Sequence, residues 1–251
     1  MEAKKIIITG SATRIGAAIA QSLAEYGVQI TLHYNRSEKE VRKLKVKMEN
    51  AGCKVFLIKA DLSKMAQTKK IIPFAFNKMK GLDCLINNAS IFEKDDLFSF
   101  NEKSFNNHIN INLKAPAILT QYFKKYLKSK KGGIINIIDQ RIFKLTPFFF
   151  SYTLSKTGLQ TLTKTSAMSL APNIRVNGIA PGPTIKNKRQ SEKHFKKQWK
   201  SLILEDKVDP KNICESVKYF IKNDNVTGQI ISVDSGQSIA WKTPDIINTK
   251  E

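Results

Sequence analysis

This sequence lacks long hydrophobic runs and has too few cysteines for a disulfide framework. Its first apolar segment, residues 6–8, is far too short for a signal peptide, and no later segment approaches the ~18 apolar residues that a membrane helix needs. The three cysteines, Cys53, Cys84 and Cys214, are far apart, odd in number and without metal-ligand spacing. We therefore expect a cytoplasmic protein in a reducing compartment, with no metal site and no membrane anchor.

Acidic residues are also scarce. The chain has 21 Asp and Glu against 42 Lys and Arg, a formal net charge of +21. Such a balance can indicate a nucleic acid, an anionic membrane or an acidic partner. However, the basic residues are spread over the whole length, and few aromatic residues interleave them as stacking platforms would require. We interpret the charge as a solvated, compositionally biased surface and do not expect nucleic acid as a partner, with a polyanion site as the alternative.

Apolar runs typical of buried strands alternate with longer helical patterns. Strands are expected at 5–9, 28–33, 54–59, 83–87, 133–138, 174–179 and 229–233, and helices at 14–26, 38–51, 68–80, 104–128, 152–171 and 213–222. This alternation specifies parallel βαβ units with right-handed crossovers. We predict one Rossmann-like, doubly wound α/β domain over residues 1–251, with about seven mostly parallel strands and helices on both faces. The charged segment 185–210 has no strand pattern and is predicted to be a substrate-loop insertion over the carboxyl edge of the sheet.

A glycine turn lies where the first strand passes into the first helix. In the stretch 9–16 (TGSATRIG), Gly10 and Gly16 would let the backbone turn tightly and approach a pyrophosphate, which would cap the helix N-terminus. The two glycines could also be plain turn residues. Their position directly after a strand favours dinucleotide binding.

The end of the second strand decides the choice of cofactor. NAD enzymes usually carry a carboxylate there for the ribose 2′-hydroxyl, whereas an arginine accommodates a 2′-phosphate. No acid occurs between positions 28 and 37, and Arg36 and Ser37 offer a guanidinium and a hydroxyl. An ordinary basic loop is the alternative, and the sequence predicts NADPH.

Tyr152 and Lys156 lie one turn apart on a predicted helix. A nearby ammonium favours the phenolate, so we expect Lys156 to lower the pKa of Tyr152 and make it a usable proton donor near neutral pH. Tyr-x-x-x-Lys alone is common by chance. Here it is accompanied, in order along the chain, by the glycine turn, the stretch 87–89 (NNA), Asn112 and the pair 181–182 (PG).

With these motifs the chain resembles the short-chain dehydrogenases/reductases over essentially its whole length. The resemblance implies a catalytic tetrad of Asn112, position 139, Tyr152 and Lys156. In that family the tyrosine is the acid/base, the lysine also holds the nicotinamide ribose, and the asparagine supports a proton-relay water. The resemblance also implies a homotetramer.

Two departures from the family pattern point to one branch. Position 139, usually serine, is Asp139, and the second glycine of the usual turn is replaced by Arg14. Together with the stretches 33–37 (HYNRS) and 87–92 (NNASIF), these residues resemble the pteridine reductases, which include dihydromonapterin and alternative dihydrofolate reductases. That branch sandwiches a pterin between the nicotinamide and an aromatic ring, and holds it with a serine and the turn arginine.

The residues fit a flat, nitrogen-rich substrate. Phe92 can stack on a pterin, and a carboxyl group at Asp139 finds ring-nitrogen partners that a ketone would not supply. Desolvation should raise the pKa of Asp139, with the charge of Lys156 opposing it. Phe92 could instead be a core aromatic, and Asp139 a turn residue at the strand end. Expected substrate contacts are Arg14, Ser90, Phe92, Asp139 and Tyr152. Expected cofactor contacts are Gly10, Arg14, Ile15, Gly16, Tyr34, Asn35, Arg36, Ser37, Asp61, Leu62, Asn88, Ala89, Ser90, Lys156, Pro181 and Gly182.

The predicted function is NADPH-dependent hydride transfer to a dihydropterin or dihydrofolate. One alternative is another short-chain reductase, such as a 3-oxoacyl-carrier-protein reductase, whose acidic carrier would suit the basic surface. Asp139 argues against this alternative, because reduction of a carbonyl requires a neutral hydroxyl donor at that position. The other alternative is a non-enzymatic protein that binds NADP or a polyanion, against which the intact Asn112, Tyr152 and Lys156 argue.

Overall fold

The protein is described here by a computed structural model that covers residues 5–25, 27–128, 130–187 and 189–241. Its strands are β1 (Lys5–Ile8), β2 (Gln29–Tyr34), β3 (Lys54–Lys59), β4 (Cys84–Asn87), β5 (Gly132–Ile137), β6 (Ile174–Pro181) and β7 (Ile230–Val233). Its α-helices are α1 (Arg14–Ser22), α2 (Glu38–Asn50), α3 (Met65–Met79), α4 (Glu102–Ile109), α5 (Ala115–Leu127), α6 (Phe150–Leu170), α7 (Glu192–Lys200) and α8 (Pro210–Lys222).

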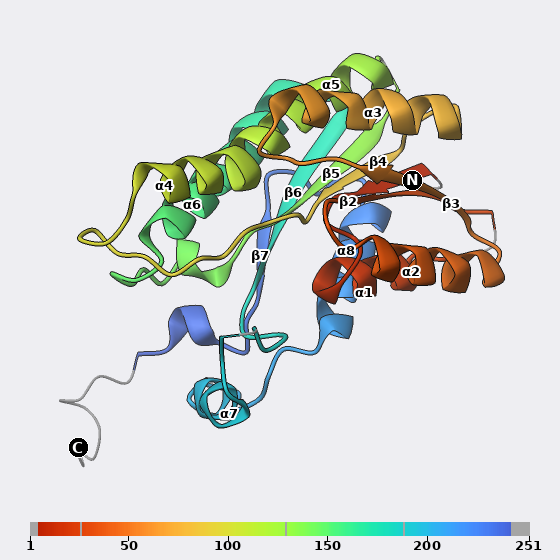
Figure 1. Cartoon of the computed structure of the whole chain (residues 1–251). Helices are drawn as coiled ribbons and strands as arrows, with labels where there is room; N and C mark the ends of the chain where they lie inside the picture. The colour runs from red at the N-terminus through yellow and green to blue at the C-terminus, as the bar shows by residue number, and fades with distance from the viewer. Residues whose placement is uncertain (1–4, 26, 129, 188, 242–251) are drawn as a thin grey trace, which may run out of the picture.

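The seven strands form one parallel sheet in the order β3-β2-β1-β4-β5-β6-β7, with helices on both faces (Figure 1). The predicted single Rossmann-like domain is thereby confirmed, and the strand ends differ from the prediction by one or two residues. No helix in the described part of the chain is long and apolar enough to cross a membrane.

The strands are rich in apolar residues because both faces of the sheet are covered. Successive side chains of a strand point to opposite faces. Ile6 and Ile8 therefore join the hydrophobic cluster that includes residues of α1, α2 and α8, whereas Ile7 joins the cluster that includes residues of α3 and α5. All three isoleucines are essentially inaccessible to solvent. This two-sided burial holds the carboxyl ends of the strands in place.

The helices depart most from the sequence prediction in two places. Helix α1 ends at Ser22, before the predicted end at Tyr26, which lies outside the described residues. The Ala24 N–H bonds to the Gln21 carbonyl, three residues back, which tightens the last turn and ends the helix. The predicted helix 104–128 begins at Glu102 and is divided into α4 and α5 by a π-helical turn, η1 (Asn110–Lys114).

The segment 185–210 contains a helix that the sequence analysis did not anticipate. Helix α7 lies in it, and the Ser191 side chain caps its N-terminus by accepting a hydrogen bond from the His194 N–H. Only Phe195 of this helix is buried. The segment runs below the carboxyl end of the sheet and returns to α8 (Figure 1).

The strand order reverses between β1 and β4, and hydrogen bonds join the chain there. The Asn88 Nδ2 amide donates to the carbonyls of Thr9 and Gly10, each at 2.9 Å. The Thr9 Oγ1 accepts from the main-chain N–H groups of Asn88 and Ala89, each at 3.0 Å. Open α/β sheets bind ligands outside the carboxyl ends of the strands at this kind of switch point.

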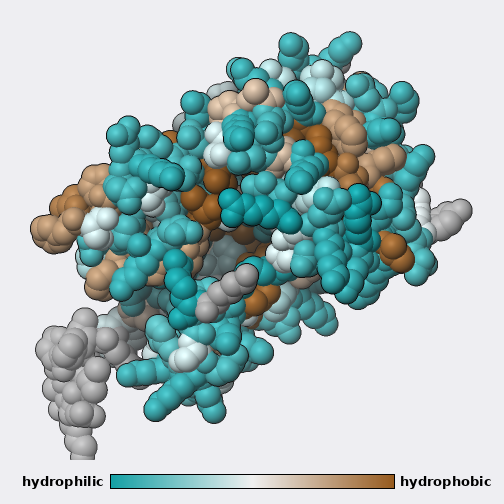
Figure 2. All heavy atoms as spheres, viewed as in Figure 1, coloured by the Kyte–Doolittle hydropathy of each residue, from teal (hydrophilic) through white to brown (hydrophobic). Residues whose placement is uncertain are grey.

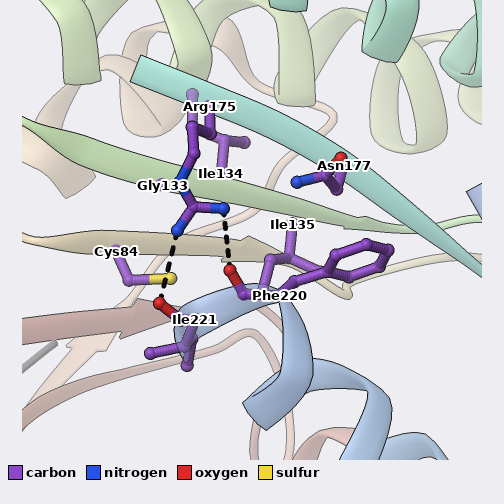
Figure 3. A pocket seen from close by; sticks show the side chains of 8 residues that line it. All are labelled: Cys84, Gly133, Ile134, Ile135, Arg175, Asn177, Phe220 and Ile221. Atoms are coloured by element: carbon purple, nitrogen blue, oxygen red, sulfur yellow. Dashed lines mark hydrogen bonds between the residues drawn. The ribbon is translucent and has the colours of Figure 1, made fainter. Parts of the chain in front are cut away.

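A small cavity at the opposite end of the strands has no room for a ligand. It has a volume of about 10 Å³, enough for a single water, and Cys84, Gly133 and Arg175 are among its lining residues (Figure 3). Arg175 donates to the carbonyls of Phe220 and Ile221 at 2.8 and 3.3 Å, which satisfies the carboxyl end of α8. We assign this arginine a structural role.

Gly16→Ala should destabilise the protein. An added Cβ would overlap the Gly10 carbonyl oxygen and lie 2.5 Å from the Asn88 Nδ2, so the backbone of the turn would have to shift. Overpacking of this kind costs about 1–3 kcal/mol, equivalent to a drop of roughly 2–4 °C in Tm per kcal/mol for a domain of this size. Thermal unfolding followed by circular dichroism measures the effect. Gly133→Ala is the control, because its Cβ would meet only the Arg175 guanidinium at 3.9 Å, and equal Tm values for the two variants would contradict the expectation.

Candidate active site

The glycine turn presents an open helix N-terminus at the switch point. Gly10 has φ +61°, and a Cβ on it would lie 2.8 Å from the Ala89 Cα, so only glycine fits there. Helix α1 begins at Arg14, and its N-cap, Thr13, makes no side-chain cap hydrogen bond. The first N–H groups of this helix, including those of Ile15 and Gly16, therefore remain available to an anion.

A cleft of about 650 Å³ extends from this turn along the carboxyl edge of the sheet. That volume lies within the range of small-molecule and cofactor sites. The surface is visibly hollowed near the middle of the face shown in Figure 2. The cleft is lined by Gly10, Ala12, Thr13, Tyr34, Asn35, Arg36, Ser37, Asp61, Ser63, Ile91, Glu93, Asn101, Lys103, Ser104, Asn107 and Ile111. It thus brings together the predicted residues of the glycine turn, the end of β2 and Asp61.

The end of β2 offers a cationic and hydroxyl-bearing corner of the cleft. Ser37 precedes α2 without using its side chain as a cap, so its hydroxyl is not committed to the helix. Burial raises the pKa of Asp61, but hydrogen bonds from Ser63 and the charges of Lys64 and Arg36 outweigh it, and the net pKa is lowered. The Asp61 carboxylate is therefore charged at neutral pH.

Several predicted cofactor residues do not line the cleft, among them Leu62, Pro181 and Gly182. The Leu62 side chain is buried in the hydrophobic core and does not line the cleft. Pro181 ends β6, and Gly182 follows it so closely against Asp234 that a Cβ on Gly182 would lie 2.7 Å from the Asp234 Cα. Pro181 and Gly182 thus position the chain where it enters the segment 185–210.

Arg14 joins the glycine turn to the segment 185–210. Its guanidinium donates to the carbonyls of Ile185 and Lys186 at 2.7 and 2.9 Å. Its backbone has φ +56°, a conformation that non-glycine residues seldom adopt. The predicted contacts of Arg14 with a pyrophosphate and a substrate stay predictions. In this structure the arginine ties the segment 185–210 to the cofactor turn.

The catalytic candidates meet above the end of β5. The Tyr152 hydroxyl donates to the Asp139 Oδ2 at 2.8 Å, and the Lys156 Nζ donates to the Ile137 carbonyl at 2.8 Å. The other Asp139 oxygen accepts from the Arg141 main-chain N–H at 2.9 Å. Asp139 therefore caps the turn after the strand and also binds the tyrosine, and its contact with a pterin stays a prediction.

Burial dominates the titration of these groups. It raises the pKa of Asp139, in the predicted direction, while hydrogen bonds from Arg141 and Tyr152 and the charges of Arg141 and Lys156 oppose it. Burial also lowers the pKa of Lys156 to about 8, against the charge of Asp139. The prediction that Lys156 would lower the pKa of Tyr152 is wrong, because burial and the Asp139 carboxylate raise it well above its ordinary value. The ammonium is directed at a carbonyl, whereas the carboxylate is bound to the hydroxyl.

Asn112 organises the loop after β4. It lies in the π-helical turn η1, a feature often found at functional sites. Its Nδ2 donates to the Ile91 carbonyl and the Ser155 hydroxyl, and its Oδ1 accepts from the Ile91 N–H and the Ser90 hydroxyl, all within 3.1 Å. The side chain is thus used within the protein, and its implied support of a relay water stays a prediction. Ser90 is held beside Tyr152, whose pKa its hydrogen bond lowers.

Phe92 belongs to the site rather than to the core. Its ring packs edge-on against Tyr152, with centroids 4.6 Å apart, and it is only partly buried. On another side it stacks on Phe149, with centroids 4.3 Å apart and planes 10° apart. The sequence analysis missed Phe149. Its φ of +61° is an outlier for a bulky residue, and the only signal in the sequence was the run of three phenylalanines at 148–150.

Comparison with known proteins agrees with this geometry. A family model described as short chain dehydrogenase matches residues 4–203. The chain is 27% identical over 239 residues to 3-oxoacyl-[acyl-carrier-protein] reductase FabG of Staphylococcus epidermidis, covering 93% of this chain and 98% of that one.

Two similar solved structures are FolM alternative dihydrofolate reductases 1, from Brucella canis and Brucella suis, each in complex with NADP. Both are 39% identical to this chain with a TM-score of 0.92. The match covers 96% of this chain in both cases, and 96% and 97% of the respective Brucella chains.

Asp139→Asn should lower the pKa of Tyr152 towards the ordinary value for tyrosine. The change removes the negative charge that raises this pKa, while an asparagine oxygen can still accept from the Arg141 N–H. Ultraviolet absorbance of tyrosinate during an alkaline titration measures it, with Tyr152→Phe as the reference that assigns the signal to this residue. An unchanged titration of Tyr152 would show that Asp139 is not the cause.

Proposed function

The chain belongs to the short-chain dehydrogenase family, a family of oxidoreductases, and from this we propose that it is an NADPH-dependent reductase of a dihydropterin or dihydrofolate. The observation that carries the proposal is the 2.8 Å hydrogen bond between Tyr152 and Asp139. It places a carboxyl group where the family usually has serine, next to the acid/base tyrosine and the ring of Phe92. The Brucella enzymes named for dihydrofolate reduction support the same assignment.

The cleft fits a phosphorylated dinucleotide. The uncapped start of α1 can receive a pyrophosphate, and the corner formed by Arg36 and Ser37 can receive a 2′-phosphate. We propose that Lys156, buried beside the end of β5, holds the nicotinamide ribose, as the family pattern implies. When bound, the cofactor supplies a hydride. Binding of NADP by the Brucella enzymes supports this choice of cofactor.

The chain's own residues supply the proton and the orientation. Because its pKa is raised, the Tyr152 phenol keeps its proton at neutral pH and can donate it to a ring nitrogen of the substrate. The Asp139 carboxyl group, bound to the same hydroxyl, can return a proton to the tyrosine. Phe92 supplies a flat face next to the phenol, and Ser90 is held in reach by Asn112. Fixed orientation of this kind contributes a large part of the rate enhancement in many enzymes.

The proposal also covers the segment 185–210, the oligomeric state and a second candidate function. We propose that the segment 185–210 is the substrate loop, because Arg14 ties it to the cofactor turn. We also propose the homotetramer that the family resemblance implies. A 3-oxoacyl-carrier-protein reductase is the second candidate, since the FabG enzyme of S. epidermidis is similar over almost the whole chain. Position 139 distinguishes the two functions.

NADPH should be preferred to NADH by about ten- to hundredfold in apparent affinity. The corner at Arg36 offers a charge-assisted contact worth about 1.5–3 kcal/mol, and no acid at the end of β2 favours the 2′-hydroxyl. Arg36→Ala should remove most of the preference, measured as the ratio of kcat/KM for the two cofactors. Arg42→Ala is the matched control, since Arg42 is exposed and paired with Glu38 on the outer face of α2. Equal use of both cofactors by the wild type and by Arg36→Ala would refute the assignment.

Asp139→Ser should abolish dihydropterin reduction although it restores the usual family tetrad. Asp139→Asn should also lose activity, by roughly 10²–10⁴-fold, because an amide keeps the cap on the Arg141 N–H but cannot pass a proton. The pH–rate profiles of the three proteins on dihydrobiopterin, with an acetoacetyl thioester alongside, test this.

The pH–rate profile of the wild type should fall on the alkaline side. Burial depresses the pKa of Lys156 to about 8, so its charged form, and the activity that needs it, should be lost as the pH rises through that value. Activity that needs the protonated carboxyl group of Asp139 is favoured on the acid side, and the raised pKa of Asp139 extends this protonated form to higher pH. Full dihydropterin activity in both Asp139 variants, or reduction of the thioester alone, would overturn the pterin assignment.

A further inference from the structure

Two arginines flank the ring of Phe92 from distant parts of the chain. Arg141 lies in the short helix η2 (Gln140–Ile142), with its guanidinium carbon 5.7 Å from the centroid of Phe92 and 4.7 Å from that of Phe149. Arg189 comes from the segment 185–210. Its guanidinium carbon is 5.6 Å from the centroid of Phe92, and it donates a hydrogen bond to the Phe92 carbonyl. Two positive charges therefore lie at one partly exposed aromatic ring.

Neither guanidinium forms an ion pair within the described residues. No carboxylate lies within ion-pair distance of either one there, whereas Arg42 and Arg175 each pair with an acid. Asp139, the acid nearest to Arg141 in sequence, uses its oxygens on the Arg141 main-chain N–H and the Tyr152 hydroxyl. Arg141 donates one side-chain hydrogen bond, to the Thr146 hydroxyl at 3.3 Å. Since a guanidinium has five N–H donors, most of this capacity is unused.

A neutral pterin offers no anionic group to these two guanidinium ions. Its ring would be positioned by Phe92 and Tyr152, and it carries no group that two guanidinium ions would bind. A pterin extended by a p-aminobenzoyl-glutamate carries two carboxylates beyond the ring. Guanidinium ions bind carboxylates with two parallel hydrogen bonds, and a carboxylate between two cations also relieves their repulsion.

We propose that Arg141 and Arg189 form a subsite for the carboxylate tail of the substrate, so that the enzyme favours a glutamate-bearing dihydrofolate over a neutral dihydropterin. The inference rests on the proposed function and specifies its substrate class. Arg189 joins this subsite to the segment 185–210, which then contributes directly to specificity. Its position is set by the hydrogen bond to the Phe92 carbonyl, so the guanidinium is oriented before a substrate arrives.

Arg189 is the residue to change, because the charge of Arg141 also acts on Asp139 and its loss would alter the chemistry. The substrates are dihydrofolate, whose glutamate carries two carboxylates, and dihydrobiopterin, a neutral dihydropterin that carries none. Arg189→Gln should raise KM for dihydrofolate about tenfold or more with kcat little changed, and leave KM for dihydrobiopterin unchanged. Arg189→Lys, which keeps the charge but not the fork, should restore part of the loss.

Lys144→Gln is the matched control. It removes a positive charge close to η2, but Lys144 donates to the Ala240 carbonyl, away from the proposed tail, so neither KM should change. An equal rise of both KM values in Arg189→Gln would reduce Arg189 to a support for Phe92 and overturn the subsite. Equal kcat/KM of the wild type for the two substrates would also overturn it while leaving the proposed function intact. If the wild type reduced neither of them, the proposed function would fail and the subsite with it.

Discussion

The amide of Asn88 and the hydroxyl of Thr9 hold together the two halves of the sheet at the point where the strand order reverses. Through these hydrogen bonds the end of β4 is fixed against the glycine turn. The turn then has no room for side chains at Gly10 and Gly16, and α1 starts with its N–H groups open. The cofactor cleft and the loop that carries Ser90 and Phe92 both extend from this junction.

Burial converts the residues above β5 into an acid-base unit. In water, a lysine next to a tyrosine would favour the phenolate, but here the Lys156 ammonium is bound to a main-chain carbonyl and the Asp139 carboxylate to the phenol. A buried carboxylate and a buried phenol that share a hydrogen bond both hold protons more tightly, because desolvation disfavours their charged forms. Burial, together with the Asp139 carboxylate, thereby raises the pKa of Tyr152.

The proposed substrate specificity rests on a different layer of the structure. The rings of Phe92 and Phe149 and the guanidinium ions of Arg141 and Arg189 belong to loops that leave three different strands. Loops on a rigid scaffold commonly carry recognition in this way. Helix α7 itself contributes little to the core, since Phe195 is its only buried residue.

The sequence by itself determined the sheet and the helices that cover it, and it proposed the catalytic residues, because strand burial, helix periodicity and the spacing of Tyr152 and Lys156 are local properties of the chain. The glycine turn and the lack of an acid before Ser37 are local in the same way, and they predicted a dinucleotide site and NADPH. Only the tertiary structure decided which way the pKa of Tyr152 moves, since this depends on the burial of the phenol and on the Asp139 carboxylate bound to it. It also decided that Phe149 stacks on Phe92 and that Arg189 reaches Phe92 across 97 positions. Contacts at such separations arise from the packing of whole elements, which no local pattern encodes.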